Sequence, residues 1–277
     1  MKRIGLIHPG AMGASIGAAA CSNQNTVLWA SVGRSEDTAA RAQRAHLEDA
    51  GTVPDLVRAS EIVLSICPPH AAGDVAREVV ELGFSGLYVE CNAISPDRTR
   101  AIQKIVESGG ADYVDGGIIG GPAWTREAGT HLYLSGPRAE EVSACFDGSP
   151  LQAPVISDRI GAASAIKMGY AAYTKGTTAL LTAILGMVER EGVREALAGQ
   201  WGDDFTSRTI QRVRANTAKA WRFEGEMYEI SDTFRGAGLP GEFHQAAAQV
   251  FKRLSHFKDQ DEPPAIEEVL ETLLNSD

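Results

Sequence analysis

The chain has 277 residues and a formal net charge of −10, with 44% hydrophobic and 22% charged residues. This length accommodates two domains with separate cores, and the composition excludes disordered and fibrous proteins. The negative charge disfavours nucleic acid or an anionic membrane surface as the main partner. The four cysteines lie far apart, without a Cys-x-x-Cys pair or a zinc-like His spacing. The sequence therefore predicts reduced thiols, no metal site and a cytoplasmic protein.

The first predicted element is an apolar strand from Arg3 to His8, which runs into a turn of small residues and a helix rich in Ala and Gly. This arrangement is typical of a dinucleotide-binding turn, in which Gly10 lets the backbone approach a pyrophosphate and Gly13 lets the helix pack on the sheet. The first glycine of that motif is replaced by His8. We expect cofactor contacts from His8, Pro9, Gly10, Ala11 and Met12. A turn that serves packing alone is the alternative.

Strands and helices then alternate as far as residue 157. The apolar runs predict strands at 26–30, 62–66, 87–91, 113–115, 131–134 and 153–156. The intervening periodicity predicts helices at 38–47, 71–82 and 96–108, the last of them capped by Ser95 and begun by Pro96. Repeated βαβ units predict a doubly wound α/β domain of Rossmann type over residues 1–157.

After residue 160 the strand patterns disappear, and a long helix is predicted at 162–188. Only Lys167 and Lys175 are charged between residues 160 and 188. A helix that is apolar all round is buried, so other helices or a partner subunit must cover it. The longest uncharged stretch after Lys175 has thirteen residues, which is too short for a membrane span. Amphipathic helices are predicted at 205–219, 226–237, 242–252 and 265–274, so residues 158–277 are expected to form an all-helical domain. The apolar helix predicts at least a homodimer.

Lys167 is the main catalytic candidate. An ammonium group on an apolar helix is costly to bury, and burial lowers the pKa of a lysine toward values useful for proton transfer. Tyr170 and Thr174 follow on the same helical face and are suited to a proton relay and to substrate contact. The alternatives are a lysine that extends to solvent and a tyrosine that belongs to the core. Lys175 lies too far along the helix to reach the same atom, so a substrate anion or a subunit contact is expected for it.

Two further segments suggest ligand contacts. Four glycines occur between Asp115 and Pro122, where exposed backbone N–H groups can hold a carboxylate or a carbonyl; a structural turn is the alternative. Arg34 and Ser35 follow the second strand, where an NAD-binding protein has an acidic residue. A guanidinium and a hydroxyl suit a 2′-phosphate, so the sequence predicts NADP in preference to NAD. An Arg34 side chain that is merely solvated is the alternative.

Taken in order, four segments of the chain resemble motifs of the β-hydroxyacid dehydrogenase superfamily, which includes 3-hydroxyisobutyrate and 6-phosphogluconate dehydrogenases. They are Gly5–Gly13, Glu90–Pro96, Asp115–Gly121 and Gly161–Tyr170. The resemblance implies a Rossmann-type domain, a helical domain that dimerises around its long helix, and hydride transfer with Lys167 as general acid or base. It places further cofactor contacts at Cys67, Pro68, Asn92 and Ala93. It places substrate contacts at Ile119, Gly120, Gly121, Tyr170, Thr174 and Glu226.

The chain departs from these motifs at polar positions. The substrate-binding serine of the family is Ile119 here, the asparagine after the lysine is Tyr170, and the ribose-side threonine is Ala93. The C-terminal half resembles a 6-phosphogluconate dehydrogenase-like branch whose helical domain has no assigned function. The expected activity is an NADP-dependent oxidoreductase acting on a small hydroxy or keto compound. An imine reductase-like enzyme and a non-catalytic nucleotide-binding protein are the alternatives.

Overall fold

The computed structural model describes residues 1–258, 260 and 262–275. The chain forms two compact units, Met1–Lys167 and a helical unit that begins at Met168. The division lies inside helix α7 (Ala162–Ala171), whereas the sequence predicts a boundary between residues 157 and 158. The difference arises because the first turns of α7 pack against strand β6 (Asp112–Ile119) of the first unit. A fading strand pattern does not reveal that contact.

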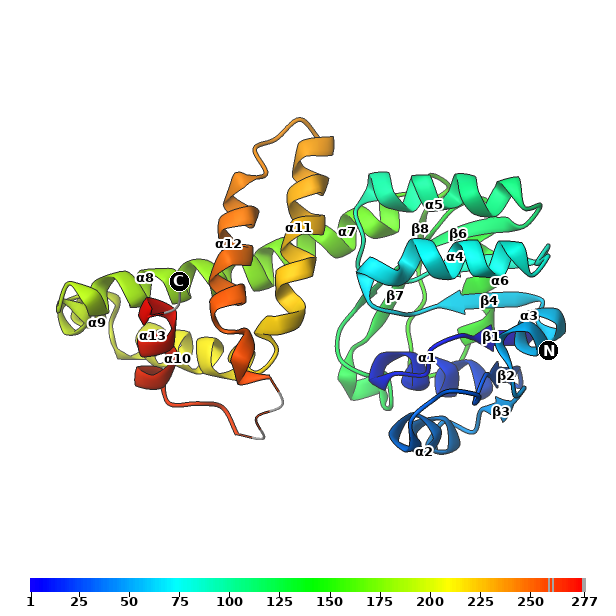
Figure 1. Cartoon of the computed structure of the whole chain (residues 1–277), viewed down its shortest axis with the longest axis horizontal. Coiled ribbons are helices and arrows are strands. Elements are labelled where there is room, and N and C mark those ends of the chain that lie inside the picture. Colours follow the sequence, from blue (N-terminus) through cyan, green and yellow to red (C-terminus); the bar gives the residue numbers. More distant parts are fainter. Residues whose placement is uncertain (259, 261, 276–277) are drawn as a thin grey trace. The chain divides into compact units, whose positions relative to one another are not determined.

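The first unit contains an eight-stranded sheet in the order β3-β2-β1-β4-β5-β6-β7-β8 (Figure 1). All neighbouring strands are parallel except the antiparallel pair β6 and β7. The remaining strands are β1 (Arg3–Leu6), β2 (Thr26–Trp29), β3 (Glu48–Asp49), β4 (Ile62–Ser65), β5 (Leu87–Glu90), β7 (His131–Ser135) and β8 (Val155–Ser157). The predicted doubly wound α/β fold is confirmed. The strand β3 was not predicted, because two exposed acidic residues carry no apolar signal.

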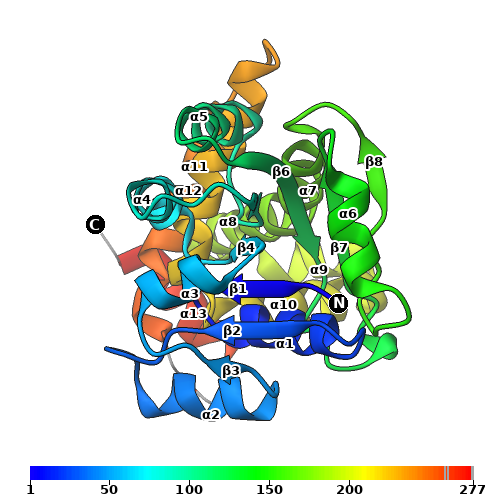
Figure 2. The same ribbon diagram turned by 90° about the vertical axis from the view of Figure 1, so that its right-hand side faces the viewer.

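Helices cover both faces of this sheet (Figure 2). Helices α1 (Ala11–Cys21) and α6 (Ala139–Ser143) contribute to one apolar core, and α3 (Val53–Ala59), α4 (Ala72–Glu81) and α5 (Pro96–Ser108) contribute to the other. Strands between two cores are buried on both sides, which explains the continuous apolar runs of β4 and β5. The predicted cap of α5 is confirmed, since the Ser95 side chain accepts a hydrogen bond from the N–H of Arg98.

Strand β6 is longer than the sequence predicts and contains the first two of the four glycines between Asp115 and Pro122. Gly116 and Gly117 pair with Leu134 and Tyr133 of β7. A Cβ on Gly116 would lie 2.9 Å from the Cys91 sulfur. Glycine inside a strand marks a close approach by another element, so these two positions serve packing. The expectation that exposed N–H groups follow directly after Asp115 is therefore wrong for Gly116 and Gly117, and irregular backbone begins only after Ile119.

The helical unit is built on one long helix. It comprises the end of α7, a π-helical turn η4 (Ala172–Gly176) and α8 (Thr177–Arg190), in agreement with the predicted helix at 162–188. The others are α9 (Arg194–Trp201), α10 (Asp203–Thr217), α11 (Ala220–Gly236), α12 (Glu242–Arg253) and α13 (Ile266–Asn275). Helices α11 and α12 pack along each other, and both contact η4. Helix α9 was not predicted, because it buries no residue and has no apolar stripe.

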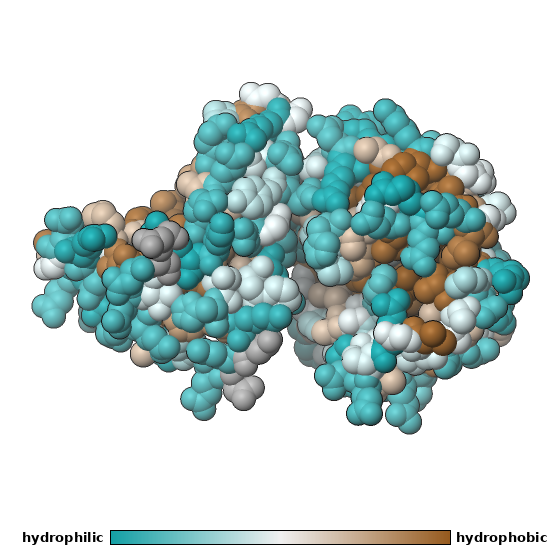
Figure 3. Space-filling model, viewed as in Figure 1, coloured by the Kyte–Doolittle hydropathy of each residue, from teal (hydrophilic) through white to brown (hydrophobic). Residues whose placement is uncertain are grey.

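The long helix is covered on one side only. Leu181 and Leu185 are buried, whereas 44% of Leu180 and 56% of Met187 are exposed. The helices of the chain itself therefore do not wrap α8 completely. The visible surface of α12 is largely hydrophilic, as expected for an amphipathic helix whose apolar residues face inward (Figure 3). Within the described part of the chain, none of the helices has the length and apolar character needed to cross a membrane.

Candidate active site

The predicted ligand residues of the first unit follow neighbouring parallel strands. Their carboxyl ends meet at one edge of the sheet, and the strand order reverses direction on either side of β1. In open α/β sheets, ligands bind outside the carboxyl ends of the strands at such a reversal. The segments concerned begin at His8 after β1, Arg34 after β2, Cys67 after β4 and Asn92 after β5.

The two glycines of the first turn have different roles. A Cβ on Gly13 would lie 2.5 Å from the carbonyl oxygen of His8, so glycine is required there for α1 to pack against the turn. A Cβ on Gly10 would meet no atom of the described residues within 4 Å, apart from its chain neighbours and the backbone of its own helix. Gly10 begins α1 without a side-chain cap, and the first turn of α1 has no acidic residue. An uncapped helix N-terminus with open space before it suits a phosphate group.

Two buried nitrogen atoms beside this turn, Nδ1 of His8 and Nε of Arg34, have no hydrogen-bond partner among the described residues. Burial, with a smaller contribution from the positive charge of Arg34, lowers the pKa of His8 to about 4. The imidazole is therefore neutral at physiological pH. Unpartnered buried polar atoms are costly, and they fit a site that is completed by a ligand with hydrogen-bonding oxygens. The residues present thus fit a dinucleotide.

A second arginine of the site, Arg41 of helix α2 (Glu36–Arg44), was not predicted. Its Nε donates to the carbonyl oxygen of Pro9 at 3.3 Å, and its Nη2 donates to the Thr38 hydroxyl at 2.9 Å. Arg34 donates to the carbonyl oxygen of Ile7 at 3.4 Å. Both guanidinium groups thus bond uncharged oxygens around the first turn. The available signal was an arginine two turns into a helix that starts beside Arg34.

Ser35 acts as a helix cap in this structure. Its hydroxyl accepts a hydrogen bond from the Thr38 N–H at 3.3 Å and lies 3.1 Å from the Thr38 hydroxyl. The predicted cofactor contact of Ser35 is thus to be made by a group that already stabilises α2. The same segment places two acidic residues, Glu36 and Asp37, in the first turn of this helix, where both are exposed.

Asn92 connects the ends of β4 and β5. Its Oδ1 accepts from the Cys67 N–H at 2.5 Å, and its Nδ2 donates to the Ser65 hydroxyl at 3.1 Å. The side chain is buried, with 3% exposed. Its amide therefore shapes the two loops that contain the predicted contacts at Pro68, which is exposed, and Ala93, which is half-buried.

Glu90 lies beneath these loops and is fully buried. Its Oε1 accepts from the Asn92 N–H at 2.9 Å, whereas no described residue provides a hydrogen-bond partner for its Oε2. Burial raises the pKa of Glu90 to about 8, although the hydrogen bond from Asn92 opposes the shift. In the sequence, Glu90 is distinguished only as the first residue of the Glu90–Pro96 segment.

Lys167 is half-buried on α7, where the sequence predicts a buried helix. Its Cβ lies 3.1 Å from the position of a Cβ built on Gly117, so the root of the side chain rests against β6. Nearby residues of α7 on its outer side, including Ile166, are exposed. The lysine is therefore rooted on the sheet of the first unit rather than enclosed in a helical core.

Three of the predicted substrate contacts lie at the end of β6 and directly after it. Ile119 is half-buried, and Gly120 has a φ of +124° and would place a Cβ 2.9 Å from Thr130. Gly121 is exposed, and a Cβ there would meet no atom of the chain within 4 Å. Packing and conformation thus account for Gly120, whereas Gly121 offers open backbone to a ligand.

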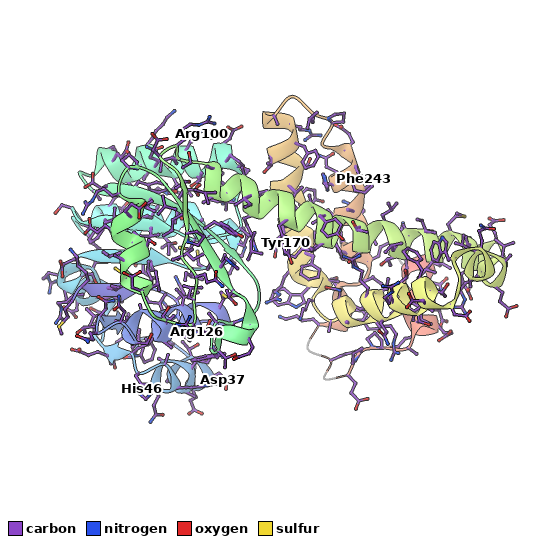
Figure 4. The ribbon with its side chains drawn as sticks, turned by 180° about the vertical axis from the view of Figure 1, so that it is seen from behind. Asp37, His46, Arg100, Arg126, Tyr170 and Phe243 are labelled. Carbon is purple, nitrogen blue, oxygen red and sulfur yellow. The ribbon has the colours of Figure 1, made fainter. Side chains whose placement is uncertain are left out.

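The remaining predicted residues belong to the helical unit. Tyr170 is 49% exposed, which excludes the alternative of a core aromatic (Figure 4). Thr174 donates its hydroxyl hydrogen to the carbonyl oxygen of Tyr170 at 2.9 Å. Lys175 forms an ion pair with Glu226, so it has an internal partner in place of the expected substrate anion or subunit contact. The carboxylate of Glu226 is engaged in the same pair.

Two family models match the chain. The model described as the NAD binding domain of 6-phosphogluconate dehydrogenase matches residues 3–146, just over half of the chain. A domain of unknown function, DUF1932, matches residues 189–254. The predicted resemblance and the predicted class of dehydrogenase or reductase are thereby confirmed at the level of the family.

Similar proteins are known in sequence and in structure. An uncharacterized 28.5 kDa protein in the 7S RNA 5′ region of Methanothermus fervidus is 29% identical over 227 residues, which cover 80% of this chain and 87% of that protein. The conserved protein MTH1747 of unknown function, described as structurally similar to 3-hydroxyacid dehydrogenases, is 27% identical with a TM-score of 0.67. The match covers 92% of this chain and 97% of MTH1747.

Two more distant structures share the fold. A 3-hydroxyisobutyrate dehydrogenase of Mycobacterium tuberculosis, solved with L-serine, is 17% identical with a TM-score of 0.68, and the match covers 99% of each chain. A variant imine reductase of Myxococcus stipitatus, solved with NAD+, is 20% identical with a TM-score of 0.55. That match covers 99% of this chain and all of the reductase. At these identities the likeness establishes the architecture alone.

Proposed function

Because the chain belongs to the family defined by the NAD-binding domain of 6-phosphogluconate dehydrogenase, we propose that it is an NADP-dependent oxidoreductase acting on a small hydroxy or keto compound. The observation that carries this proposal is the position of Lys167. Its root packs against β6, and β6 belongs to the same sheet as the strand that precedes the dinucleotide turn. A proton donor and a nucleotide turn on one rigid sheet are what a hydride-transfer enzyme requires.

The preference for NADP rests on two arginines. Arg34 and Arg41 both lie beside the first turn, and their hydrogen bonds go to backbone carbonyls and a hydroxyl. Within the described part of the chain neither guanidinium has a carboxylate partner, and such groups near the end of β2 favour a 2′-phosphate over a free ribose hydroxyl. The buried, unpartnered Nε of Arg34 would gain an acceptor there.

The chemical role of the chain is to position and protonate the substrate. The nicotinamide ring, when bound, supplies or accepts the hydride. In the reductive direction the ammonium group of Lys167 donates a proton to the carbonyl oxygen as the carbon receives the hydride, and in the oxidative direction the free amine takes the proton back. Gly121 offers backbone N–H to a carboxylate or carbonyl of the substrate. The half-buried Ile119 favours substrates that carry an apolar group next to its side chain.

A second chain completes the helical unit in this proposal. Leu180 and Met187 of α8 and Tyr173 of η4 are exposed, and they recur at intervals of seven residues along the long helix. Large exposed apolar side chains on one helix are typical of a subunit interface. We expect a homodimer at micromolar concentration, and sedimentation of the Met187→Glu variant as a monomer would support this interface.

The direct test is nucleotide titration followed by a panel of carbonyl compounds. Binding of NADPH, seen as a change in its fluorescence, and turnover of at least one aldehyde or ketone are expected. Lys167→Ala should keep nucleotide affinity and reduce turnover by about 100-fold or more. Lys104→Ala, an exposed lysine of α5, is the matched control and should behave like the parent chain.

Other outcomes separate the alternatives. Absence of binding for both NADPH and NADH overturns the proposal. Turnover of cyclic imines without turnover of ketones would favour an imine reductase, in which Tyr170 is the proton donor. Tight nucleotide binding by the parent chain, unchanged in Lys167→Ala and without turnover of any compound tested, would favour a non-catalytic nucleotide-binding protein.

A further inference from the structure

Asp115 is the most heavily bonded side chain of β6. Its carboxylate is completely buried and accepts five hydrogen bonds. The donors are the hydroxyls of Thr99 (3.2 Å), Ser135 (3.0 Å) and Ser164 (2.6 Å) and the backbone N–H groups of Gly161 (2.9 Å) and Ser164 (3.0 Å). Five uncharged donors satisfy a buried carboxylate that would otherwise be costly.

Three of these five bonds come from the start of α7. Gly161 precedes the helix, and Ser164 lies in its first turn. The N-terminus of a helix has free N–H groups and a positive partial charge, which suit an anion. Ser135 strengthens the same junction, because its hydroxyl donates to Asp115 and accepts from the N–H of Ala163 at 3.0 Å. Asp115 therefore anchors the beginning of α7 to the middle of the sheet.

A second contact fixes the helix one turn further on. Gly117 is two residues after Asp115 in β6 and lies on the same face of the strand. A Cβ at Gly117 would lie 2.4 Å from the carbonyl oxygen of Ala163 and 3.1 Å from the Cβ of Lys167. Any larger residue would thus push α7 away from the strand at the level of Lys167.

The segment before α7 is held as well. Arg100, labelled in Figure 4, lies on α5. Its guanidinium donates to the carbonyl oxygen of Ile160 at 3.4 Å. Gly161 has a φ of +101°, and a Cβ there would lie 2.3 Å from the Arg100 guanidinium. The backbone conformation just before α7 is therefore fixed, and the first turn of the helix is bonded to Asp115.

We propose that Asp115 is a positioning residue, which sets the place of the Lys167 amine by anchoring α7 onto β6. The proposal rests on the proposed function, since Lys167 is taken there as the proton donor. Asp115 is enclosed by donors from the chain and has no part in the chemical step itself. Proton transfer requires hydrogen-bond reach, and a displacement of about 1 Å costs a large factor in rate.

The test uses Asp115→Asn and Gly117→Ala in the full chain. Asp115→Asn keeps the size of the side chain and removes its charge, and Gly117→Ala shifts the helix while leaving the anchor in place. Asp112→Asn is the matched control, because Asp112 begins the same strand but is exposed and paired with Arg138. Both test variants should keep NADPH affinity and KM, whereas kcat should fall by about tenfold or more.

A second readout does not depend on activity. The rate of acetylation of Lys167 by acetic anhydride, followed by mass spectrometry across pH, reports the pKa and the accessibility of this amine. A shifted profile is expected in both test variants and an unchanged profile in Asp112→Asn. If Asp115→Asn does not fold, Ser164→Ala and Thr99→Val each remove one donor and serve in its place.

The two proposals fail in different ways. Full turnover in Lys167→Ala would overturn the proposed function, while the acetylation profile would still report the anchoring. Variants of Asp115 and Gly117 that fold, bind NADPH and keep both the parental kcat and the parental acetylation profile would overturn the positioning role.

Discussion

Lys175 and Glu226 form an ion pair inside the helical unit, where 17% and 16% of their side chains are exposed. The pair joins the π-helical turn η4 to helix α11, and the Lys175 ammonium also lies 4.9 Å from the centre of the Phe223 ring. A π-helical turn interrupts the regular hydrogen bonds of a helix, and such turns are frequent at functional sites. Here the π-helical turn contains Lys175, one of the two charged residues between residues 160 and 188.

Breaking this pair from one side should destabilise the protein strongly. Lys175→Met leaves the Glu226 carboxylate in a largely buried place without its partner, which is expected to lower the free energy of unfolding by about 3–5 kcal/mol. Removing both charges with Lys175→Met and Glu226→Leu should cost much less. Urea denaturation measures both, and Arg208→Met, from the exposed pair with Asp204, is a control expected to change little.

Nucleotide choice should depend on the two arginines beside the first turn. Arg34→Ala and Arg41→Ala are each expected to weaken NADPH binding by about tenfold to 100-fold, because a charge-assisted hydrogen bond to the 2′-phosphate is lost. NADH binding should change little in both. Fluorescence titration measures the two affinities, and Arg58→Ala, an exposed arginine of α3, controls for the loss of one positive charge. An equal loss for both nucleotides would contradict the assignment.

The buried carboxyl of Glu90 should make the protein less stable as pH rises. Its pKa is about 8 in the folded chain and 4.5 as the ordinary value, so the folded state holds a proton that the unfolded state releases between these pH values. Stability from this group is complete below pH 4.5, is lost progressively as pH rises from 4.5 to about 8, and changes no further above that pH. Glu90→Gln keeps the acceptor for Asn92 and should be more stable than the parent at pH 9, by up to about 5 kcal/mol. Thermal unfolding across pH tests this, with the exposed Glu107→Gln as control.

His8 should give the opposite dependence in the acid range. Its pKa falls from 6.5 to about 4 on folding, so the unfolded state binds the proton first as pH drops. The contribution of the neutral imidazole is complete above pH 6.5 and is lost as pH falls through about 4. His8→Gln should reduce the change in unfolding temperature between pH 6.5 and 4. The exposed His70→Gln should leave this pH dependence as it is in the parent chain. The same slope in all three proteins would contradict a neutral, buried His8.

The main features of the fold were predictable from local patterns. Continuous apolar runs identified the buried strands β4 and β5, and the Ser95-Pro96 start identified α5. The short elements β3 and α9 were not predictable, because exposed or unburied residues leave no periodic signal. The roles of the four glycines between Asp115 and Pro122 were not predictable either. A glycine needed for packing inside β6 cannot be told in sequence from one that exposes its backbone to a ligand.

The sequence by itself determined the alternation of strands and helices, the dinucleotide turn and the two lysines on an otherwise uncharged helix, because these depend on neighbours within a few residues. Only the tertiary structure decided which groups are already engaged. It showed that Gly13 is needed for packing whereas Gly10 is not, and it placed Arg41 beside the first turn. It also paired Lys175 with Glu226 and gathered five donors around Asp115. Such contacts join residues far apart in the chain, and their energies depend on burial and hydrogen-bond satisfaction that no local pattern contains.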